Sequence, residues 1–180
     1  MKTFVEIGSC DFDTCYPLLE NGWRGIMVEP VAEILNNVPD HKNLIKVNKV
    51  ISDYNGSIKF NVTSAEEGWR HGMSVVASDN HIGENLFEYQ QNAPYLKETR
   101  TLECITLDQL LDEYSVGDID YLKIDTEGHE MNIIRAYSWR VMPSFIKLEH
   151  SHIDDVEMKR ILEQLGYIVY VEQQDIYAVG

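Results

Sequence analysis

The segment 121–137 constrains the fold most strongly, because it changes from strand-like to helix-like within a few residues. Its first four residues, Tyr-Leu-Lys-Ile, are typical of a buried parallel strand, and Asp125 follows where that strand should end. The six residues from Asp125 to Glu130 hold three carboxylates, counting Asp125, together with His129 and Gly128. The rest of the segment spaces its apolar side chains as a helix does. Open α/β sheets build binding sites from such strand ends, turns and helices.

Length and composition indicate one soluble globular domain over residues 1–180. Hydrophobic residues make up 44% of the chain, but no apolar run reaches the roughly 18 residues of a membrane span. The chain enters a strand-like run at once and shows no signal peptide, and its three cysteines lack metal-type spacing. We therefore expect a cytoplasmic protein with reduced thiols and no membrane partner.

Acidic residues outnumber basic ones by 30 to 15, which gives a formal net charge of −15. Nucleic-acid binding rests largely on Lys and Arg side chains that neutralise phosphates, so this balance argues against a nucleic-acid partner. The acidity otherwise indicates solubility.

Apolar strand-like runs alternate with segments of helical spacing along the chain. Strands are expected at residues 3–7, 24–29, 44–51, 57–62, 100–105, 121–124, 144–149, 167–172 and 176–179. Helices are expected up to about residue 19, as a short helix at 31–38, and at 106–114, 131–137 and 154–165. Thr106 with Gln109, and Asp154 with Glu157, are typical helix caps. The alternation predicts an α/β domain with a mostly parallel sheet and helices on both faces, and the last two strands predict a C-terminal antiparallel hairpin.

Residues 63–99 form the least regular stretch, and they include Trp69, His71, Ser74 and His81. In a compact domain a long irregular insertion is often a lid or a substrate loop. We therefore expect this stretch to cover an acceptor pocket, with disorder as the alternative. A second subunit of a homo-oligomer is the other source of a lid.

The ends of the first two strands carry a weak cofactor signal. Gly8 follows the first strand, where glycine lets a ligand approach the backbone, and Glu29 ends the second strand 21 residues later. An acid at about this spacing is placed to accept both hydroxyls of a ribose, although chance is the alternative. A dinucleotide fingerprint would need glycines where Cys10 and Asp13 stand, which argues against an NAD or nucleotide-sugar enzyme. S-adenosylmethionine has a ribose but no phosphate.

Four segments, in order over nearly the whole chain, form a specific pattern. They are Phe-Val-Glu-Ile-Gly-Ser at 4–9, Gly-Trp-Arg-Gly-Ile-Met-Val-Glu-Pro at 22–30, Thr-Leu-Asp-Gln-Leu-Leu at 106–111 and Asp-Tyr-Leu-Lys-Ile-Asp-Thr-Glu-Gly-His-Glu at 120–130. In these segments the sequence resembles the FkbM-type S-adenosylmethionine-dependent methyltransferases. The resemblance implies a class I methyltransferase fold, which is Rossmann-like, with S-adenosylmethionine as cofactor.

The resemblance also implies which residues bind the cofactor: Glu6, Gly8, Ser9, Glu29, Pro30, Asn48 and Asp53. Gly8 and Ser9 would lie near the methionine end, and Glu29 would take the ribose hydroxyls. Residues 48–53 would flank the adenine, and Glu6 would help to orient the amino group. The first loop, Asp-Phe-Asp at 11–13, departs from relatives that have a second glycine there. This departure bears on cofactor affinity rather than on the fold.

Methyl transfer to a hydroxyl requires alignment of the acceptor oxygen and removal of its proton. His129 is the first candidate for the general base, and Asp125 stands beside it in the catalytic set. A surface or substrate-binding histidine is the alternative. Glu130 is expected to interact with the positive end of the following helix. The resemblance implies an acceptor hydroxyl on a sugar, a glycan or a small polar metabolite.

Asp125, Glu149 and His150 end two strands that should be neighbours, and they form a candidate metal site. Carboxylate oxygens suit Mg²⁺, whereas a histidine suits a softer ion. Alternatively, Asp125 and Glu149 only bind substrate hydroxyls or hold loops. For the whole domain, the alternative to an enzyme is a catalytically inactive cofactor-binding protein with the same fold.

Overall fold

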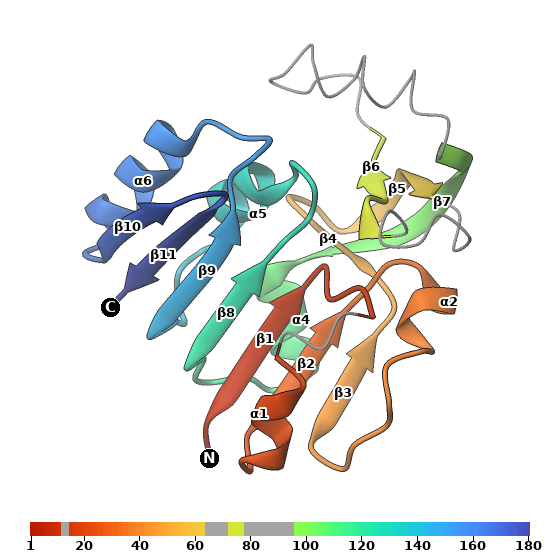
Figure 1. The fold of residues 1–180 in the computed structure, drawn as a ribbon, viewed down its shortest axis with the longest axis horizontal. Coiled ribbons are helices and arrows are strands. Elements are labelled where there is room, and N and C mark those ends of the chain that lie inside the picture. Colours follow the sequence, from red (N-terminus) through yellow and green to blue (C-terminus); the bar gives the residue numbers. More distant parts are fainter. Residues whose placement is uncertain (12–14, 64–71, 78–95) are drawn as a thin grey trace.

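The computed structural model of the protein describes residues 1–11, 15–63, 72–77 and 96–180 (Figure 1). Its main sheet has seven strands in the order β10-β11-β9-β8-β1-β2-β3. These are β1 (Thr3–Ile7), β2 (Arg24–Val28), β3 (Leu44–Val47), β8 (Tyr121–Ile124), β9 (Phe145–Glu149), β10 (Ile168–Glu172) and β11 (Asp175–Val179). From β3 to β9 the strands are parallel, whereas β11 is antiparallel to both β9 and β10. The predicted mostly parallel sheet and C-terminal hairpin are confirmed.

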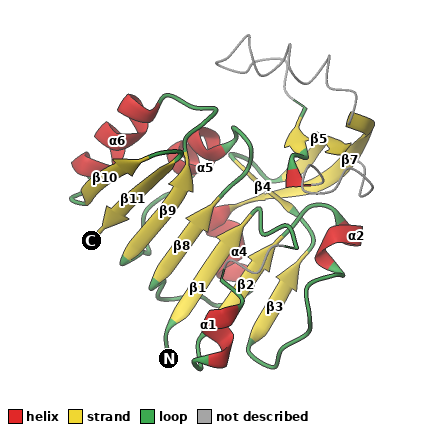
Figure 2. Ribbon diagram, in the orientation of Figure 1, coloured by secondary structure: helices red, strands yellow, loops and turns green. Residues whose placement is uncertain are grey.

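Helices cover both faces of the main sheet, because its central strands are apolar on both sides (Figure 2). The helices are α1 (Pro17–Glu20), α2 (Ala32–Leu35), α4 (Leu107–Glu113), α5 (Glu130–Ala136) and α6 (Asp155–Gln164). Helices α4, α5 and α6 share a buried cluster with Val5, while α1 and α2 share another with Phe4. Successive strand residues point to opposite faces, so β1 contributes to both clusters.

The predicted caps of two helices are present. Thr106 Oγ1 accepts a hydrogen bond from the Gln109 N–H at 3.1 Å, and Asp154 Oδ1 accepts one from the Glu157 N–H at 2.9 Å. The Gln109 side chain, however, donates to Glu113 instead of returning to the cap. Only half of the expected capping box therefore forms at α4.

A second sheet lies beyond the carboxyl ends of β1, β2 and β3 (Figure 1). Its strands follow the order β4-β7-β5-β6, with β4 (Val50–Ser52), β5 (Gly56–Thr63), β6 (Val75–Val76) and β7 (Leu96–Thr106). They bury their own apolar cluster, to which α2 contributes Ile34. The sheet forms one wall above the strand ends of the main sheet.

The prediction of one strand over residues 44–51 was wrong. β3 ends at Val47, and β4 starts at Val50 in the second sheet. Between them, Asn48 Nδ2 donates to the carbonyl oxygens of Glu29 at 2.9 Å and Pro30 at 2.8 Å. These bonds hold the chain where it leaves the main sheet, and a continuous apolar run gives no sign of them.

The insertion predicted at residues 63–99 lies mostly outside the described residues. Within it the structure describes the end of β5, residues 72–77 with β6, and the start of β7. None of the helices in the described ranges has both the length and the apolar content needed to span a bilayer.

Candidate functional site

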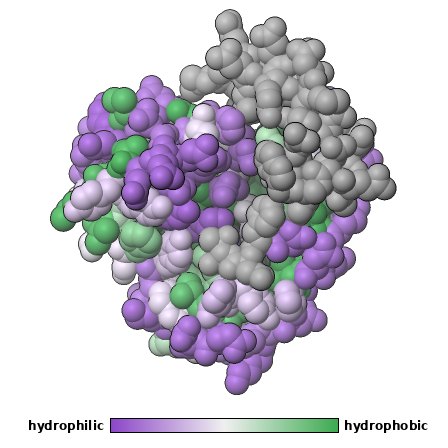
Figure 3. Space-filling view, viewed as in Figure 1, coloured by the Kyte–Doolittle hydropathy of each residue, from purple (hydrophilic) through white to green (hydrophobic). Residues whose placement is uncertain are grey.

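A cavity lies between the carboxyl ends of β1, β2 and β8 and the second sheet. The space between its walls is about 900 Å³, which includes volume open to solvent. Figure 3 shows the face of the molecule seen in Figure 1, which is mostly hydrophilic and is hollowed near its centre. The walls include Gly8, Glu29, Lys123, Asp125 and His129 from the main sheet and Phe60 from the second. Ligands of open α/β sheets bind at this edge, so the cavity is the candidate site.

Gly8 allows the ends of β1 and β8 to approach closely. Its φ is +75°, and a Cβ placed there would lie 1.7 Å from the carbonyl oxygen of Asp125. The N–H groups of Gly8 and Ser9 both donate to the Val28 carbonyl, at 3.0 and 3.1 Å. Those two amides therefore hold β1 to β2, and Gly8 contributes to the cavity through its lack of a side chain.

Glu29 presents a carboxylate whose orientation is fixed by the backbone. Its Oε2 accepts from the Cys10 N–H at 3.0 Å, and its Oε1 accepts from the Val31 N–H at 2.8 Å. The side chain is 6% exposed, and it lines the cavity together with Pro30. Each carboxylate oxygen has further acceptor capacity, so this group can still bind hydroxyl donors.

Glu6, Lys123 and Asp125 form a buried chain of charges that reaches the cavity. Lys123 Nζ lies 3.1 Å from Glu6 Oε1 and 3.4 Å from Asp125 Oδ2. Glu6 is fully buried and outside the cavity wall, whereas Lys123 and Asp125 line it. Burial acts to lower the pKa of Lys123, but the neighbouring charges of Glu6 and Asp125 outweigh it and raise that pKa. Glu6 therefore holds a charged lysine at the cavity.

His129 lines the cavity and contacts a serine from the second sheet. Its Nε2 lies 3.0 Å from Ser52 Oγ, and both residues are buried. Ser52 Oγ in turn donates to Asp53 Oδ1 at 3.0 Å. Since the hydroxyl has one proton, Ser52 must accept from Nε2–H, which leaves the lone pair of neutral His129 on Nδ1. Asp53 thus acts through Ser52 and does not line the cavity.

Glu130 organises the loop between β8 and α5. Its carboxylate accepts from the Thr126 N–H and Oγ1–H at 2.6 and 2.9 Å, and from the Gly128 N–H at 3.0 Å. Burial raises the pKa of Glu130 to about 7, against the effect of these donors. Its role goes beyond the expected interaction with a helix terminus, because it fixes the turn between Asp125 and His129.

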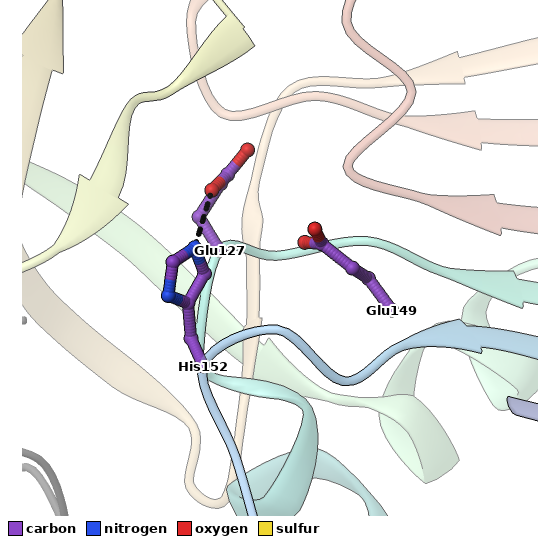
Figure 4. Close-up of side chains that lie close together, drawn as sticks. All are labelled: Glu127, Glu149 and His152. Atoms are coloured by element: carbon purple, nitrogen blue, oxygen red, sulfur yellow. Dashed lines mark ion pairs between the residues drawn. The ribbon is translucent and has the colours of Figure 1, made fainter. Parts of the chain in front are cut away.

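Glu127, Glu149 and His152 converge at the rim of this loop (Figure 4). One possible ligand atom from each lies within 4.8 Å of the others, and His152 Nε2 is 3.4 Å from Glu127 Oε2. The hydrogen bond that His152 donates to the Glu127 carboxylate is the main reason why the pKa of His152 is raised. Burial, followed by the charges of Glu127 and Asp125, raises the pKa of Glu149.

This cluster differs from the metal-ligand set expected from the sequence. Glu149 belongs to both sets, but Asp125 and His150 lie outside the cluster. Successive residues at a strand end point to opposite sides, so Glu149 and His150 are poorly placed to share one ion. The His150 N–H is also held by the Gln174 carbonyl at 2.8 Å.

The cavity includes five of the predicted site residues: Gly8, Glu29, Pro30, Asp125 and His129. Glu6, Ser9, Asn48, Asp53, Glu149 and His150 lie outside its walls. Sequence reasoning missed Lys123 and Ser52. The signal for Lys123 was a charge inside an otherwise apolar strand, whereas nothing local marked Ser52, which contacts a residue 77 positions away.

Comparison with known families decides what kind of domain carries this cavity. A family model described as "Methyltransferase FkbM domain" matches residues 5–169. The chain belongs to the FkbM methyltransferase family. The resemblance carried by the four sequence segments is confirmed, and so is the predicted α/β fold of a class I methyltransferase.

Solved structures are similar to this FkbM-family chain at low sequence identity. Methyltransferase FkbM from Methylobacillus flagellatus KT has a TM-score of 0.57 at 12% identity, over 99% of this chain and 43% of that one. The fibrillarin/Nop5p complex has a TM-score of 0.46 at 11% identity, with 98% and 70% covered. Precorrin-6y C5,15-methyltransferase from Geobacter metallireducens GS-15 has 0.47 at 15% identity, with 99% and 81% covered. No curated protein matches the sequence.

Proposed function

We propose that this FkbM-family chain transfers a methyl group from S-adenosylmethionine to a hydroxyl of a sugar, a glycan or a small polar metabolite. The observation that carries the proposal is that Glu29 and His129 line one cavity. Glu29 offers a fixed acceptor for ribose hydroxyls, and His129 offers a base for the acceptor hydroxyl. The FkbM structure that resembles this chain is more than twice its length, so the acceptor of this chain is itself part of the proposal.

Cofactor binding would draw on groups at the ends of β1, β2 and β8. Glu29 would accept the two ribose hydroxyls, since backbone donors already orient its carboxylate. The cavity has an apolar wall near Glu29, formed by Val28, Val50 and Ile51. Such a wall suits a flat adenine ring. Lys123 and Asp125, of opposite charge and 3.4 Å apart, would face the carboxylate and amino groups of the methionine end.

The chemistry would rest on positioning and on one proton transfer. S-adenosylmethionine, when bound, would supply a methyl group activated by its sulfonium sulfur. The S–CH₃ bond would break as the new C–O bond forms, with S-adenosylhomocysteine as the leaving group. The chain must hold the acceptor oxygen in line with that methyl group. His129 Nδ1 would take the hydroxyl proton, because Ser52 occupies the other ring nitrogen.

Formation of S-adenosylhomocysteine tests the proposal. The purified chain would be incubated with S-adenosylmethionine and pools of neutral sugars, glycosides and hydroxylated metabolites, and the product would be measured by mass spectrometry. We expect acceptor-dependent product and a mass gain of one methyl group on an acceptor oxygen. Cofactor binding without product in any pool would instead favour an inactive binding domain, and methylation at nitrogen or carbon would contradict O-methylation.

A further inference from the structure

Three metal-ligating side chains from separate segments meet beside the candidate site. Glu149 ends β9, Glu127 stands in the loop after β8, and His152 stands between β9 and α6. Figure 4 shows the Glu149 carboxylate turned toward the other two side chains. All three are half-buried, and their candidate ligand atoms lie within 4.8 Å of one another. An ion bound between them would link the loop after β8 to the segment 149–152 that follows β9.

The charges of this cluster are poorly compensated by the protein. Glu127 pairs with His152, and in the described part of the chain neither Glu127 nor Glu149 forms an ion pair with a lysine or arginine. Other acids near the site are paired differently: Glu6 and Asp125 share Lys123. Two half-buried carboxylates held this close repel each other, and a cation between them would remove that cost.

The cluster is continuous with the cavity. Glu127 belongs to the cavity wall and to the cluster at once, and Asp125 and His129 flank it in the same loop. Glu149 and His152 lie behind this wall, on the side away from Glu29 and β2. An ion here would therefore sit at the acceptor side of the cavity rather than at its ribose side.

From this arrangement we infer that Glu127, Glu149 and His152 form a divalent-cation site that holds the acceptor. Two carboxylate oxygens and one imidazole nitrogen suit Mn²⁺, Co²⁺ or Zn²⁺ better than Mg²⁺, which prefers oxygen ligands throughout. Three protein ligands leave positions open for oxygens of the acceptor, such as two neighbouring hydroxyls.

The role of the ion rests on the proposed function. A hydroxyl bound to a divalent cation loses its proton more readily, so His129 would remove that proton with less difficulty. The same oxygen would then form a bond to the methyl carbon while the bond from that carbon to the sulfonium sulfur breaks, with S-adenosylhomocysteine as the leaving group and the proton on His129. The inference also narrows the acceptor class to molecules with two adjacent oxygen donors.

Binding of Mn²⁺ alone tests the site without any cofactor or acceptor. The chain would be treated with EDTA, desalted and titrated with MnCl₂, with free Mn²⁺ followed by electron paramagnetic resonance. We expect one tight site per chain, weakened at least about tenfold by Glu149→Gln and by His152→Ala. The control Glu172→Gln removes the same charge from an exposed strand end and should bind Mn²⁺ as the unaltered chain does.

The outcomes separate this inference from the proposed function. The absence of tight binding, or equal weakening by Glu172→Gln, would overturn the site and reveal only diffuse attraction to an acidic surface. Affinity for S-adenosylmethionine, measured in the same variants, should not change, because Glu149 and His152 do not line the cavity. Thus a chain that binds Mn²⁺ at this site but not S-adenosylmethionine would contradict the proposed function and leave the metal site standing.

Discussion

At the scale of single residues, the hydrogen bonds of Ser52 determine which ring nitrogen of His129 would act as the base. Ser52 Oγ donates to Asp53 and accepts from His129 Nε2, and this order leaves Nδ1 as the basic atom. The same histidine with its proton on Nδ1 could not accept a proton there. The protein thus sets the tautomer from the second sheet.

His129→Ala should remove the base and leave the cofactor side intact. We expect turnover to fall by about 10²-fold or more, since general-base catalysis contributes on this order. Affinity for S-adenosylmethionine, measured by calorimetry, should stay nearly the same because Glu29 is untouched. Unchanged turnover would exclude His129 as the base.

Ser52→Ala should have a smaller effect of the same kind. Without the hydroxyl, His129 populates both tautomers, and turnover should fall on the order of tenfold with little change in KM for the cofactor. Ser57→Ala, at an exposed serine of β5 in the same sheet, is the matched control and should retain full turnover. A Ser52→Ala variant with the same turnover as the control would exclude a role for Ser52 in setting the tautomer of the base.

At the scale of elements, the ends of β1 and β8 and the turn into α5 form the functional unit. Gly8 lets the two strand ends meet, and Glu130 ties the turn back on itself. Neither residue touches the reacting atoms in the proposed function. Both residues determine where Asp125 and His129 lie. Substitution of either one should therefore lower the free energy of unfolding before it lowers the rate of methyl transfer.

Gly8→Ala should destabilise the fold more than an equivalent change elsewhere. A Cβ at Gly8 collides with the Asp125 carbonyl, and the backbone also has a positive φ, so we expect a loss of about 1–3 kcal/mol beyond the conformational strain. Gly22 has φ +81° and no atom within 4 Å of its added Cβ, so Gly22→Ala should show the strain alone. Urea denaturation of both variants measures the difference, and equal losses would contradict the close approach.

Glu130 should make stability depend on pH. Its pKa rises from 4.5 to about 7 on folding, so the folded state binds the proton more tightly than the unfolded state. The stability that this group contributes is therefore full below about pH 4.5 and is lost as pH rises through 7, by on the order of 3 kcal/mol. Unfolding of the unaltered chain and of Glu130→Gln, compared from pH 5 to 8, should show this extra decline only in the former. Parallel curves would mean that the pKa is not raised.

At the scale of the whole molecule, the sequence predicted what local pattern determines. The strands at 3–7 and 121–124 are short apolar runs bounded by acids or glycine, and the terminal hairpin has a clear turn. The departure at Asn48 could not be predicted, because the two carbonyls that hold it belong to residues 18 and 19 positions away. After that turn the chain enters the second sheet as β4, which carries Ser52 to its contact with His129.

The residues of the candidate site also divide into those that a local sequence pattern predicts and those that it does not. Gly8, Glu29, Asp125 and His129 were predicted because each stands at or just beyond a strand end. Glu6 and Asn48, which were expected at the cofactor, lie outside the cavity wall, where Glu6 contacts Lys123 and Asn48 donates to the Glu29 carbonyl after β2. The directions of these two side chains depend on how several segments pack together. The spacing of residues in the sequence carries no information about that packing.

The central claim is that the cavity at the ends of β1, β2 and β8 binds S-adenosylmethionine through Glu29. Isothermal titration calorimetry tests it with the unaltered chain, Glu29→Gln and the exposed control Glu20→Gln. Binding of one molecule per chain should be weakened at least about tenfold by Glu29→Gln, since hydrogen bonds to a charged group contribute roughly 1.5–3 kcal/mol. Glu20→Gln should bind like the unaltered chain. No heat with S-adenosylmethionine, or equal affinity in Glu29→Gln, would contradict the account.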